Sequence, residues 1–253
     1  ILRIPIPLDD FVKAKGLSPA ALGERLSADR RKLLEVRSQR VRPGLDDKIL
    51  TDWNGLMIAA LAKASRAFDE PTYLLQAESC AAFLLTSMKA KGHLWHRYGH
   101  GQAGVQAFLD DYAFTVWGLI ELYQASRNPQ HLASALELHG DMVRHFWDPQ
   151  EKSFRMSPKE GESLFMTPRE IYDGAYPSGN SVAALNALRL SRLTGDMKLV
   201  AQAEGVLGAF VSEVSRAPSA HSMLMMALDF ALGPTREVVI AGDPASAEIR
   251  EMF

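Results

Sequence analysis

The chain has 253 residues, of which 47% are hydrophobic and 23% charged, and its formal net charge is -2 at pH 7. This composition is typical of a globular protein with a sizeable core and excludes a disordered chain. Lysine and arginine form no basic stripe, so we expect no nucleic-acid partner. The longest apolar runs, 56–62 and 223–228, fall short of the roughly 20 residues that cross a bilayer, so no membrane partner is expected either.

The first 45 residues are predicted to form an extended segment followed by linker helices. Prolines in ILRIPIPL disfavour a helix at the start. Ser18 with Pro19, and then Ser27, have the residue types that cap helices near 19–26 and 28–39. The chain begins with Ile and shows no signal-peptide pattern, so we interpret it as part of a longer, cytoplasmic protein.

A two-helix pattern recurs three times between residues 46 and 232. Asp52 aligns with Asp110 at an offset of 58 residues, and Asp110 aligns with Ser178 at an offset of 68. One helix starts at each of these positions and ends at a breaker, at 69–71, 127–129 or 194–196. The helix that follows has one polar side, which is typical of an outer helix.

The first helix of each repeat is apolar on nearly every side, as in residues 56–62, which predicts burial between neighbours. We therefore predict an all-α fold, a partial (α/α)6 toroid of three and a half helical hairpins over 46–232. The half unit begins near Pro218. After Gly233, the stretch REVVIAG predicts a short β segment that starts a C-terminal extension over 233–253.

All inner helices of such a toroid start at the same end, where the segments that join successive hairpins also gather. Carboxylates, amides and aromatic rings at one rim are typical of sugar recognition. We expect the resulting cleft to collect the following residues: Asp52, Trp53, Asn54, His96, Arg97, His100, Asp110, Asp111, Tyr112, Asp173, Tyr176, Ser178 and Asn180.

Three of these residues have a second interpretation. Asp52, Asp110 and Ser178 are all residue types that cap helix N-termini, so each could have a structural or a catalytic role. Asp111 is different, because Asp110 would already cap the helix and an adjacent carboxylate would be repelled by it. We therefore favour a functional role for Asp111.

No metal or cofactor is expected. The histidines of HLWHRYGH are assigned to a loop, and their spacing does not match a zinc motif. The stretch GHGQAG fits the dinucleotide-binding pattern, but no strand-helix-strand unit surrounds it, so it is interpreted as a flexible loop. Trp117 is assigned to helix packing.

Five blocks occur in a characteristic order: LDDKILTDWNGLMIAALA, FLDDYAFTVWGLIELY, FWD, DGAYPSGNSVAALNALRL and VVIAGD. In this order they resemble the C-terminal half of the spermatogenesis-associated, thioredoxin-domain-containing protein family. The helical part of that family is similar to six-hairpin glycosidases and N-acylglucosamine 2-epimerases. The resemblance implies an α/α toroid that has an N-terminal thioredoxin-like domain of the same full-length chain as its partner, and it establishes no reaction.

Different classes of function fit the expected cleft. A glycoside hydrolase-like reaction would use Asp111 as general acid, with Asp52 or Asp173 as the second carboxylate. A sugar epimerase-like reaction would use two bases, for which His96 and His100 are the candidates. The alternatives are a non-catalytic module that binds a sugar-like ligand, a peptide or a partner domain, and a scaffold for the thioredoxin-like domain.

Overall fold

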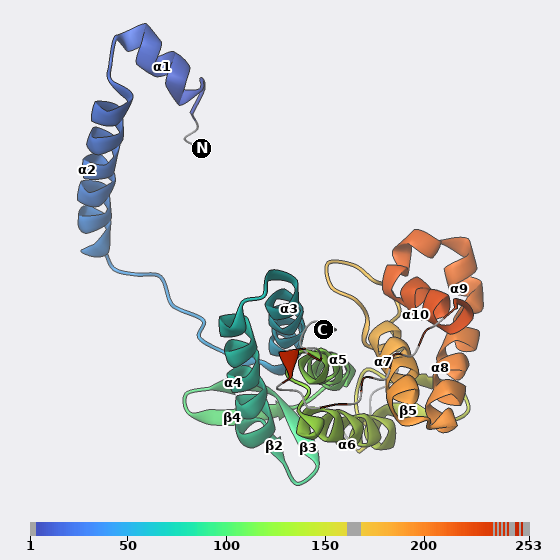
Figure 1. The fold of residues 1–253 in the computed structure, drawn as a ribbon. Helices are drawn as coiled ribbons and strands as arrows, with labels where there is room; N and C mark the ends of the chain where they lie inside the picture. Colours follow the sequence, from blue (N-terminus) through green and yellow to red (C-terminus); the bar gives the residue numbers. More distant parts are fainter. Residues whose placement is uncertain are drawn as a thin grey trace. The chain divides into compact units, whose positions relative to one another are not determined.

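The computed structural model describes residues 4–160 and 168–234, and residues 236, 238, 240, 242, 246, 247 and 249. The chain divides into two compact units, Ile1–Asp47 and Lys48–Phe253. The first unit contains α1 (Leu8–Lys15) and α2 (Pro19–Ser38) (Figure 1). The break predicted at Ser27 is wrong, because α2 runs through that position without interruption.

The second unit is built from helical hairpins, as predicted. The hairpins are α3 (Thr51–Phe68) with α4 (Pro71–Ser87), α5 (Leu109–Ser126) with α6 (Pro129–Phe146), and α7 (Gly179–Thr194) with α8 (Met197–Ala209). The helices α3, α5 and α7 pack side by side, and α10 (Ser222–Leu232) adds a fourth inner helix beside α7. Figure 1 shows these helices as an inner arc with α4, α6 and α8 outside it. The described residues therefore form the predicted partial α/α toroid.

The predicted breakers between paired helices are confirmed, and their chemistry explains the tight turns. Each outer helix begins directly after a side chain that accepts a backbone hydrogen bond from its first turn, supplied by Glu70, Asn128 or Asp196. Two of these helices start with proline, which suits the first helical position because it lacks an N–H group. The inner helix before each turn ends in a left-handed residue, so the chain reverses within three residues.

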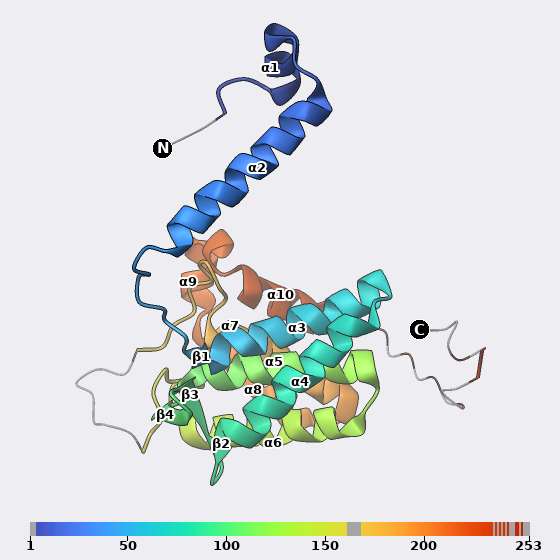
Figure 2. The ribbon, with the colours of Figure 1, turned by 90° about the vertical axis from the view of Figure 1, so that its left-hand side faces the viewer.

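Glycine allows the first two inner helices to approach closely. A Cβ atom at Gly55 would lie 2.6 Å from the backbone of Phe114, and one at Gly118 would lie 2.7 Å from the carbonyl oxygen of Gly55. Only a residue without a side chain fits at these positions. Figure 2 shows α3 and α5 lying side by side, with the outer helices α4 and α6 along them. This contact fixes the position of the α3 start relative to the α5 start.

Short strands interrupt the helical architecture between α4 and α5. The strand β3 (His93–Gly99) pairs antiparallel with β1 (Ile49–Leu50), β2 (Lys89–Ala90) and β4 (Gln102–Gln106). The predicted loops at HLWHRYGH and GHGQAG are therefore wrong, since both belong to this hairpin. His100 and Gly101 have φ angles of 51° and 77°, which suits a two-residue hairpin turn.

A second pair of short strands, β5 (Trp147–Asp148) and β6 (Ser153–Phe154), follows α6. The outer layer continues after α8 with α9 (Val211–Arg216) and a 3-10 turn, Pro218–Ala220, before α10 begins. The strand predicted at REVVIAG lies partly outside the described residues and is not tested. Within the described part of the chain, no helix has both the length and the apolar character needed to span a bilayer.

Candidate functional site at the inner-helix starts

Carboxylates tie the starts of neighbouring inner helices together. An oxygen of Asp111 in α5 accepts a hydrogen bond from the backbone N–H of Asp52 in α3, at 3.0 Å. The neighbouring carboxylate of Asp110 accepts from the backbone N–H of Gly179 in α7. A third, Asp173, accepts from the backbone of Ser178 and, at 2.8 Å, from Met223 in α10. The four helix starts therefore converge at one end, as predicted.

The predicted capping roles are correct for one residue of three. Ser178 is the N-cap of α7, and its hydroxyl oxygen accepts from the backbone N–H of Ser181. The N-cap prediction is wrong for Asp52 and Asp110, because α3 begins at Thr51 and α5 at Leu109, which places both carboxylates inside the first turn. Acidic side chains are favourable there too, since the first turn of a helix carries partial positive charge.

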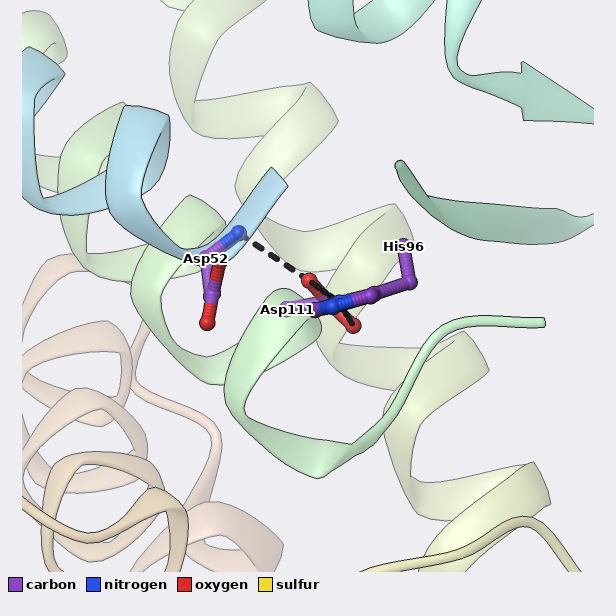
Figure 3. A group of neighbouring side chains, drawn as sticks. All are labelled: Asp52, His96 and Asp111. Carbon is purple, nitrogen blue, oxygen red and sulfur yellow. Dashed lines mark hydrogen bonds and ion pairs between the residues drawn. The ribbon is translucent and has the colours of Figure 1, made fainter. Parts of the chain in front are cut away.

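Asp111 provides much of the connection at the α5 start. Its carboxylate is 1% exposed and accepts hydrogen bonds from the backbone N–H groups of Asp52 and Phe108. The Nδ1 atom of His96 lies 3.0 Å from both of its oxygens (Figure 3). Burial raises the pKa of Asp111, whereas the hydrogen bonds from His96 and Phe108 oppose that rise. Asp111 thus holds two chain segments and one imidazole ring in place.

His96 comes from β3 and is oriented by this contact. A carboxylate only accepts hydrogen bonds, so the Nδ1 atom carries the hydrogen and Nε2 is the remaining nitrogen. The hydrogen bond to Asp111 raises the pKa of His96, despite partial burial. The ring also makes an edge-to-face contact with Phe108, at 5.2 Å between centroids. The site therefore contains an imidazole in a fixed orientation.

The carboxyl group of Asp110 has a raised pKa. Burial, with the nearby charges of Asp111 and Asp52, raises the pKa of Asp110 to about 6. Gly179 permits this close arrangement, because a Cβ there would overlap the Asp110 carboxylate. Burial also raises the pKa of Asp52. Asp110 therefore keeps its proton to a higher pH than an ordinary aspartate does.

Glu170 also contributes negative charge to this cluster and was missed in the sequence. Its charge adds to the rise in the pKa of Asp110. The carboxylate accepts hydrogen bonds from the backbone N–H groups of Ile171 and Tyr172. Glu170 lies in the irregular segment before α7, where neither helical nor strand periodicity places a side chain, so no pattern identified it.

Asp52, His96 and Asp111 could in principle hold a metal ion, since one ligand atom from each lies within 4.8 Å of the others. Hydrogen bonds, however, already account for the approach of His96 and of the Asp52 backbone to Asp111. Both oxygens of Asp111 accept backbone N–H groups, and Nδ1 of His96 donates to the same carboxylate. The arrangement is complete as a hydrogen-bonded group, and we assign it no metal.

Two predicted substrate-binding residues are instead buried structural residues. Tyr112 is 2% exposed, and its hydroxyl accepts from the backbone N–H of Leu94. Asn180 is fully buried, and its amide bonds to both backbone polar groups of Phe154 and to the carbonyl of Glu170. Their burial and their structural hydrogen bonds argue against direct contact of either side chain with a ligand.

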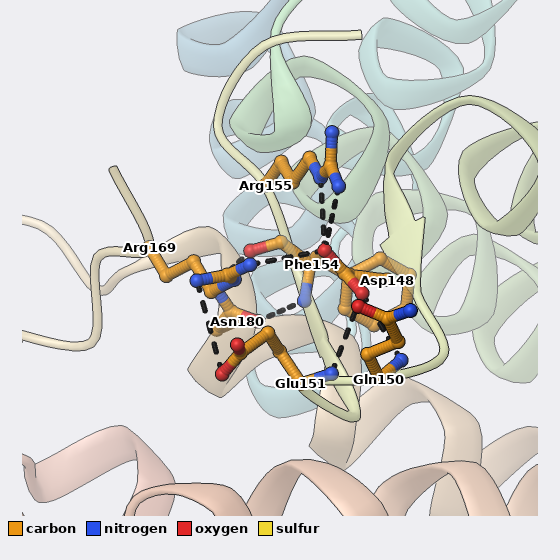
Figure 4. Close-up of polar contacts among 7 residues, drawn as sticks. All are labelled: Asp148, Gln150, Glu151, Phe154, Arg155, Arg169 and Asn180. Atoms are coloured by element: carbon orange, nitrogen blue, oxygen red, sulfur yellow. Dashed lines mark hydrogen bonds and ion pairs between the residues drawn. The ribbon is translucent and has the colours of Figure 1, made fainter. Parts of the chain in front are cut away.

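Asn180 belongs to a network that anchors the α7 start to the β5–β6 hairpin (Figure 4). At its centre, Asp148 is 5% exposed and accepts from Arg155, Arg169 and the turn backbone. The hydrogen bond from Arg155 is the main reason that the pKa of Asp148 lies well below its usual value. This network positions α7 and lies outside the carboxylate cluster.

Asn54 and Asp173 also have structural partners. The amide of Asn54 donates to the carbonyl of Leu50 and accepts from the thiol of Cys80 on the outer helix α4. Asp173 accepts hydrogen bonds from backbone N–H groups at the starts of α7 and α10, so both of its oxygens already have partners there. Both roles stabilise the convergence of helices.

The remaining predicted residues are accessible but dispersed. His100 occupies the hairpin turn, four residues from His96, and at roughly 3.3 Å per strand residue this is about 13 Å along β3. Arg97 is exposed on the same strand. Trp53 and Tyr176 are 60% and 50% exposed. The structure therefore brings together Asp52, His96, Asp110 and Asp111, and it does not pair His96 with His100.

Comparison with solved structures identifies the class of fold. A cellobiose 2-epimerase from Bacillus thermoamylovorans superposes with a TM-score of 0.60 at 14% identity, over 74% of this chain and 56% of that one. A family 76 α-mannanase from Bacteroides thetaiotaomicron gives 0.55 at 18% identity, over 67% and 46%. An inactive family 76 α-1,6-mannanase variant from Salegentibacter, with two consecutive aspartates changed to asparagine and α-1,6-mannotriose bound, gives 0.52 at 12% identity, over 70% and 50%. The chain therefore has the α/α-toroid fold of six-hairpin enzymes.

Sequence comparison leads to particular relatives. Spermatogenesis-associated protein 20 of mouse is 32% identical over 264 residues, which is all of this chain and 33% of the mouse protein. The human protein of the same name is 33% identical over 263 residues, again all of this chain and 34% of that protein. No protein-family model matches. The chain is thus homologous to spermatogenesis-associated protein 20 and spans about a third of its length, which confirms the resemblance.

Proposed function

We propose that the inner-helix starts form a carbohydrate-active cleft in which Asp110 is the general acid and Asp52 the second carboxylate. The observation that carries this proposal is the meeting of Asp52, Asp110 and the His96–Asp111 pair where α3, α5 and α7 begin. Glycoside hydrolysis uses one protonated and one ionised carboxyl group on either side of the bond that breaks. A carboxyl whose pKa is near 6 can supply the proton at neutral pH.

Asp110 suits the acid role better than Asp111, which the sequence had favoured. Asp111 is 1% exposed, and its oxygens already accept hydrogen bonds from two backbone segments and His96. A carboxyl in that state has no free position from which to protonate a leaving group. Asp111 would instead act as a positioning residue for His96 and for the start of α3.

An epimerase-like reaction has less support. It requires two bases on opposite faces of the sugar. His96 is a suitable base, since Asp111 fixes its orientation and Nε2 remains available. His100, its proposed partner, lies at the hairpin turn and far along the strand. Hydrolysis would use two residues that lie at the site, Asp52 and Asp110. Epimerisation would use only His96 there, because His100 lies elsewhere.

The neighbours support a carbohydrate ligand only by similarity of fold. The mannanase variant in complex with α-1,6-mannotriose is inactive when two consecutive aspartates are changed. Of the three consecutive aspartate pairs in this sequence, Asp110–Asp111 lies at an inner-helix start. Exposed Trp53 and Tyr176 are the candidates for stacking on a sugar ring.

A panel of oligosaccharides and aryl glycosides, including α-1,6-mannotriose and cellobiose, tests the proposal. We expect wild-type protein to hydrolyse at least one member and Asp110→Asn to reduce kcat at least about 100-fold. Asp69→Asn is the matched control, because it makes the same chemical change at the exposed, left-handed end of α3 and should leave turnover unchanged. Equal turnover by Asp110→Asn and wild type would overturn the assignment.

The non-catalytic alternative has one observation in its favour. The oxygens of Asp111 and Asp173 hold helix starts together, as they would in a module that only binds. In that case a sugar or peptide ligand would bind with equal affinity to wild type and Asp110→Asn, and no product would form. Contact with a thioredoxin-like domain of the same full-length chain, and a cytoplasmic location, remain predictions from the sequence.

A further inference from the structure

A pocket lies toward the opposite ends of the same inner helices. It has a volume of about 470 Å³, within the range of small-molecule sites. Four inner helices line it, with Lys63 and Arg66 from α3, Trp117 and Glu121 from α5, Arg189 from α7 and Phe230 from α10. Glu121 is eleven residues after Asp110, or about 16 Å along α5 at 1.5 Å per residue. The pocket is therefore separate from the carboxylate cluster.

Glu121 organises three cations in this pocket. Its side chain is 2% exposed and accepts from Arg189 at 2.8 Å, from Arg66 at 3.0 Å and from the indole of Trp117 at 3.1 Å. Lys63 lies 3.5 Å away. Burial alone would raise the pKa of Glu121, but the charges of Arg189 and Lys63 bring it below its ordinary value. Glu121 is therefore ionised and lies between the three cations.

The cations exceed the negative charge available to them. Lys63, Arg66 and Arg189 face Glu121 and the exposed Asp229, which leaves one net positive charge in the pocket. Arg189 is held tightly, since its side chain is 14% exposed and it also donates to Gln124. The Lys63 and Arg66 side chains are 53% and 44% exposed, so part of their donor capacity faces solvent.

A single arginine would suffice to neutralise Glu121. Arg189 alone makes the shortest contact and is the most buried of the three cations. The last turn of a helix favours cations, which helps to explain Arg66 at the end of α3. Neither effect accounts for Lys63, whose 3.5 Å separation from Glu121 is long and which lies 5.6 Å above the centre of the Trp117 ring.

The rest of the pocket wall is apolar. Trp117, Leu185, Met226 and Phe230 line it, and Met226 is 57% exposed. An apolar wall next to a few fixed charged groups is typical of a site for a small organic ligand. Arginine and lysine together bind the oxygens of phosphate and carboxylate groups well.

We propose that this pocket binds a small organic anion, with its phosphate or carboxylate group at Lys63, Arg66 and Arg189 and its body against Trp117 and Phe230. Glu121 orients the cations and does not contact the ligand. The site is independent of the proposed hydrolysis, since it shares no residue with the carboxylate cluster. Two kinds of anionic group fit the same donors, namely a phosphate and a carboxylate.

Titration at low ionic strength with inorganic phosphate and with citrate tests the proposal. Calorimetry and tryptophan fluorescence report binding, and Trp117→Phe identifies the optical signal. We expect saturable binding of at least one anion, weakened at least about tenfold in Lys63→Gln/Arg66→Gln. Lys198→Gln, which removes one positive charge from the outer helix α8, should bind as wild type does. The side chains of Lys63, Arg66 and Lys198 are exposed, so the variants should fold.

The outcomes separate the alternatives. Binding of phosphate without citrate indicates a phosphate ester, and the reverse indicates a carboxylic acid. Binding should persist in Asp110→Asn, so failure of the proposed hydrolysis does not affect this result. Absence of saturable binding to folded protein overturns the proposal, as does binding that survives in Lys63→Gln/Arg66→Gln or falls equally in Lys198→Gln.

Discussion

The two ends of the inner helices stabilise buried carboxylates in different ways. At the helix starts, Asp111 accepts from backbone N–H groups and one imidazole, and no arginine or lysine of the described part of the chain is among its hydrogen-bond partners. Near the other ends, Glu121 has two arginines and a lysine around it. The difference follows from the helices, because their starts offer free N–H donors and partial positive charge, whereas their ends offer neither.

The contrast has a chemical consequence. Backbone donors stabilise the carboxylates at the starts without cancelling their charge, so Asp52 and Asp111 still act on Asp110 and raise its pKa. Cations near the other ends exceed the carboxylate charge and leave donors available to an anion. The same four helices therefore have excess carboxylates at their starts and excess cations near their other ends, which is the basis of the two proposals.

The largest expected effect is that of Asp111→Asn. The amide cannot accept from all three donors, and its NH2 group would face another donor. We expect a loss of about 4 kcal/mol in the free energy of unfolding, comparable to breaking a buried charged pair. Urea denaturation measures it, with Asp69→Asn as control. An unchanged midpoint would mean that the α3 and α5 starts do not depend on this carboxylate.

Glu121→Gln should have the next largest effect. Removing the charge leaves three cations close together around a neutral amide, and we expect a loss of about 3 kcal/mol. The substitution leaves the repulsion between the three cations uncompensated. Because salt screens this repulsion, part of the lost stability should recover at high ionic strength. Denaturation at low and high ionic strength gives both values. A loss that salt does not change would point to packing instead.

Asp110→Asn should instead increase the free energy of unfolding at neutral pH. With its pKa raised from 3.8 to about 6, Asp110 binds its proton more tightly in the folded state, so its ionisation destabilises the fold as pH rises through that interval. The asparagine variant should therefore be more stable than wild type above about pH 7, by about 3 kcal/mol, and lose this advantage near pH 4. A constant difference across this range would refute the raised pKa.

Trp53→Ala should have the smallest effect on stability. The side chain is 60% exposed at the α3 start, so we expect a change of about 0.5 kcal/mol or less. If the ring stacks on a sugar, binding of any oligosaccharide that the protein recognises should nonetheless weaken. Thermal denaturation and calorimetry separate the two quantities. A large loss of stability would make Trp53 a core residue.

The repeat and its breakers were predictable because they depend on local chemistry. Apolar periodicity identified the inner helices, and Pro71, Pro129 and Gly195 marked the turns. The β hairpin was missed, because residues 93–98 show no regular alternation of polar and apolar side chains that would have revealed a strand.

The separate roles of Asp110 and Asp111 could not be predicted from the sequence. Asp110 and Asp111 are adjacent in sequence, but successive residues of a helix point about 100° apart, so only one of them turns toward His96. The burial of Tyr112 and Asn180 depends on contacts with Leu94 and Phe154, which lie 18 and 26 residues away in the sequence. Such long-range contacts leave no local pattern.

The central claim is that separate inner helices bring their carboxylates to one place. Carboxyl NMR titration of Asp110, in wild type and in Asp52→Asn, tests it most directly, because Asp52 belongs to α3 and Asp110 to α5. We expect a pKa near 6 in wild type and a lower value in Asp52→Asn. An ordinary pKa near 3.8, or a raised pKa that Asp52→Asn leaves unchanged, would contradict it.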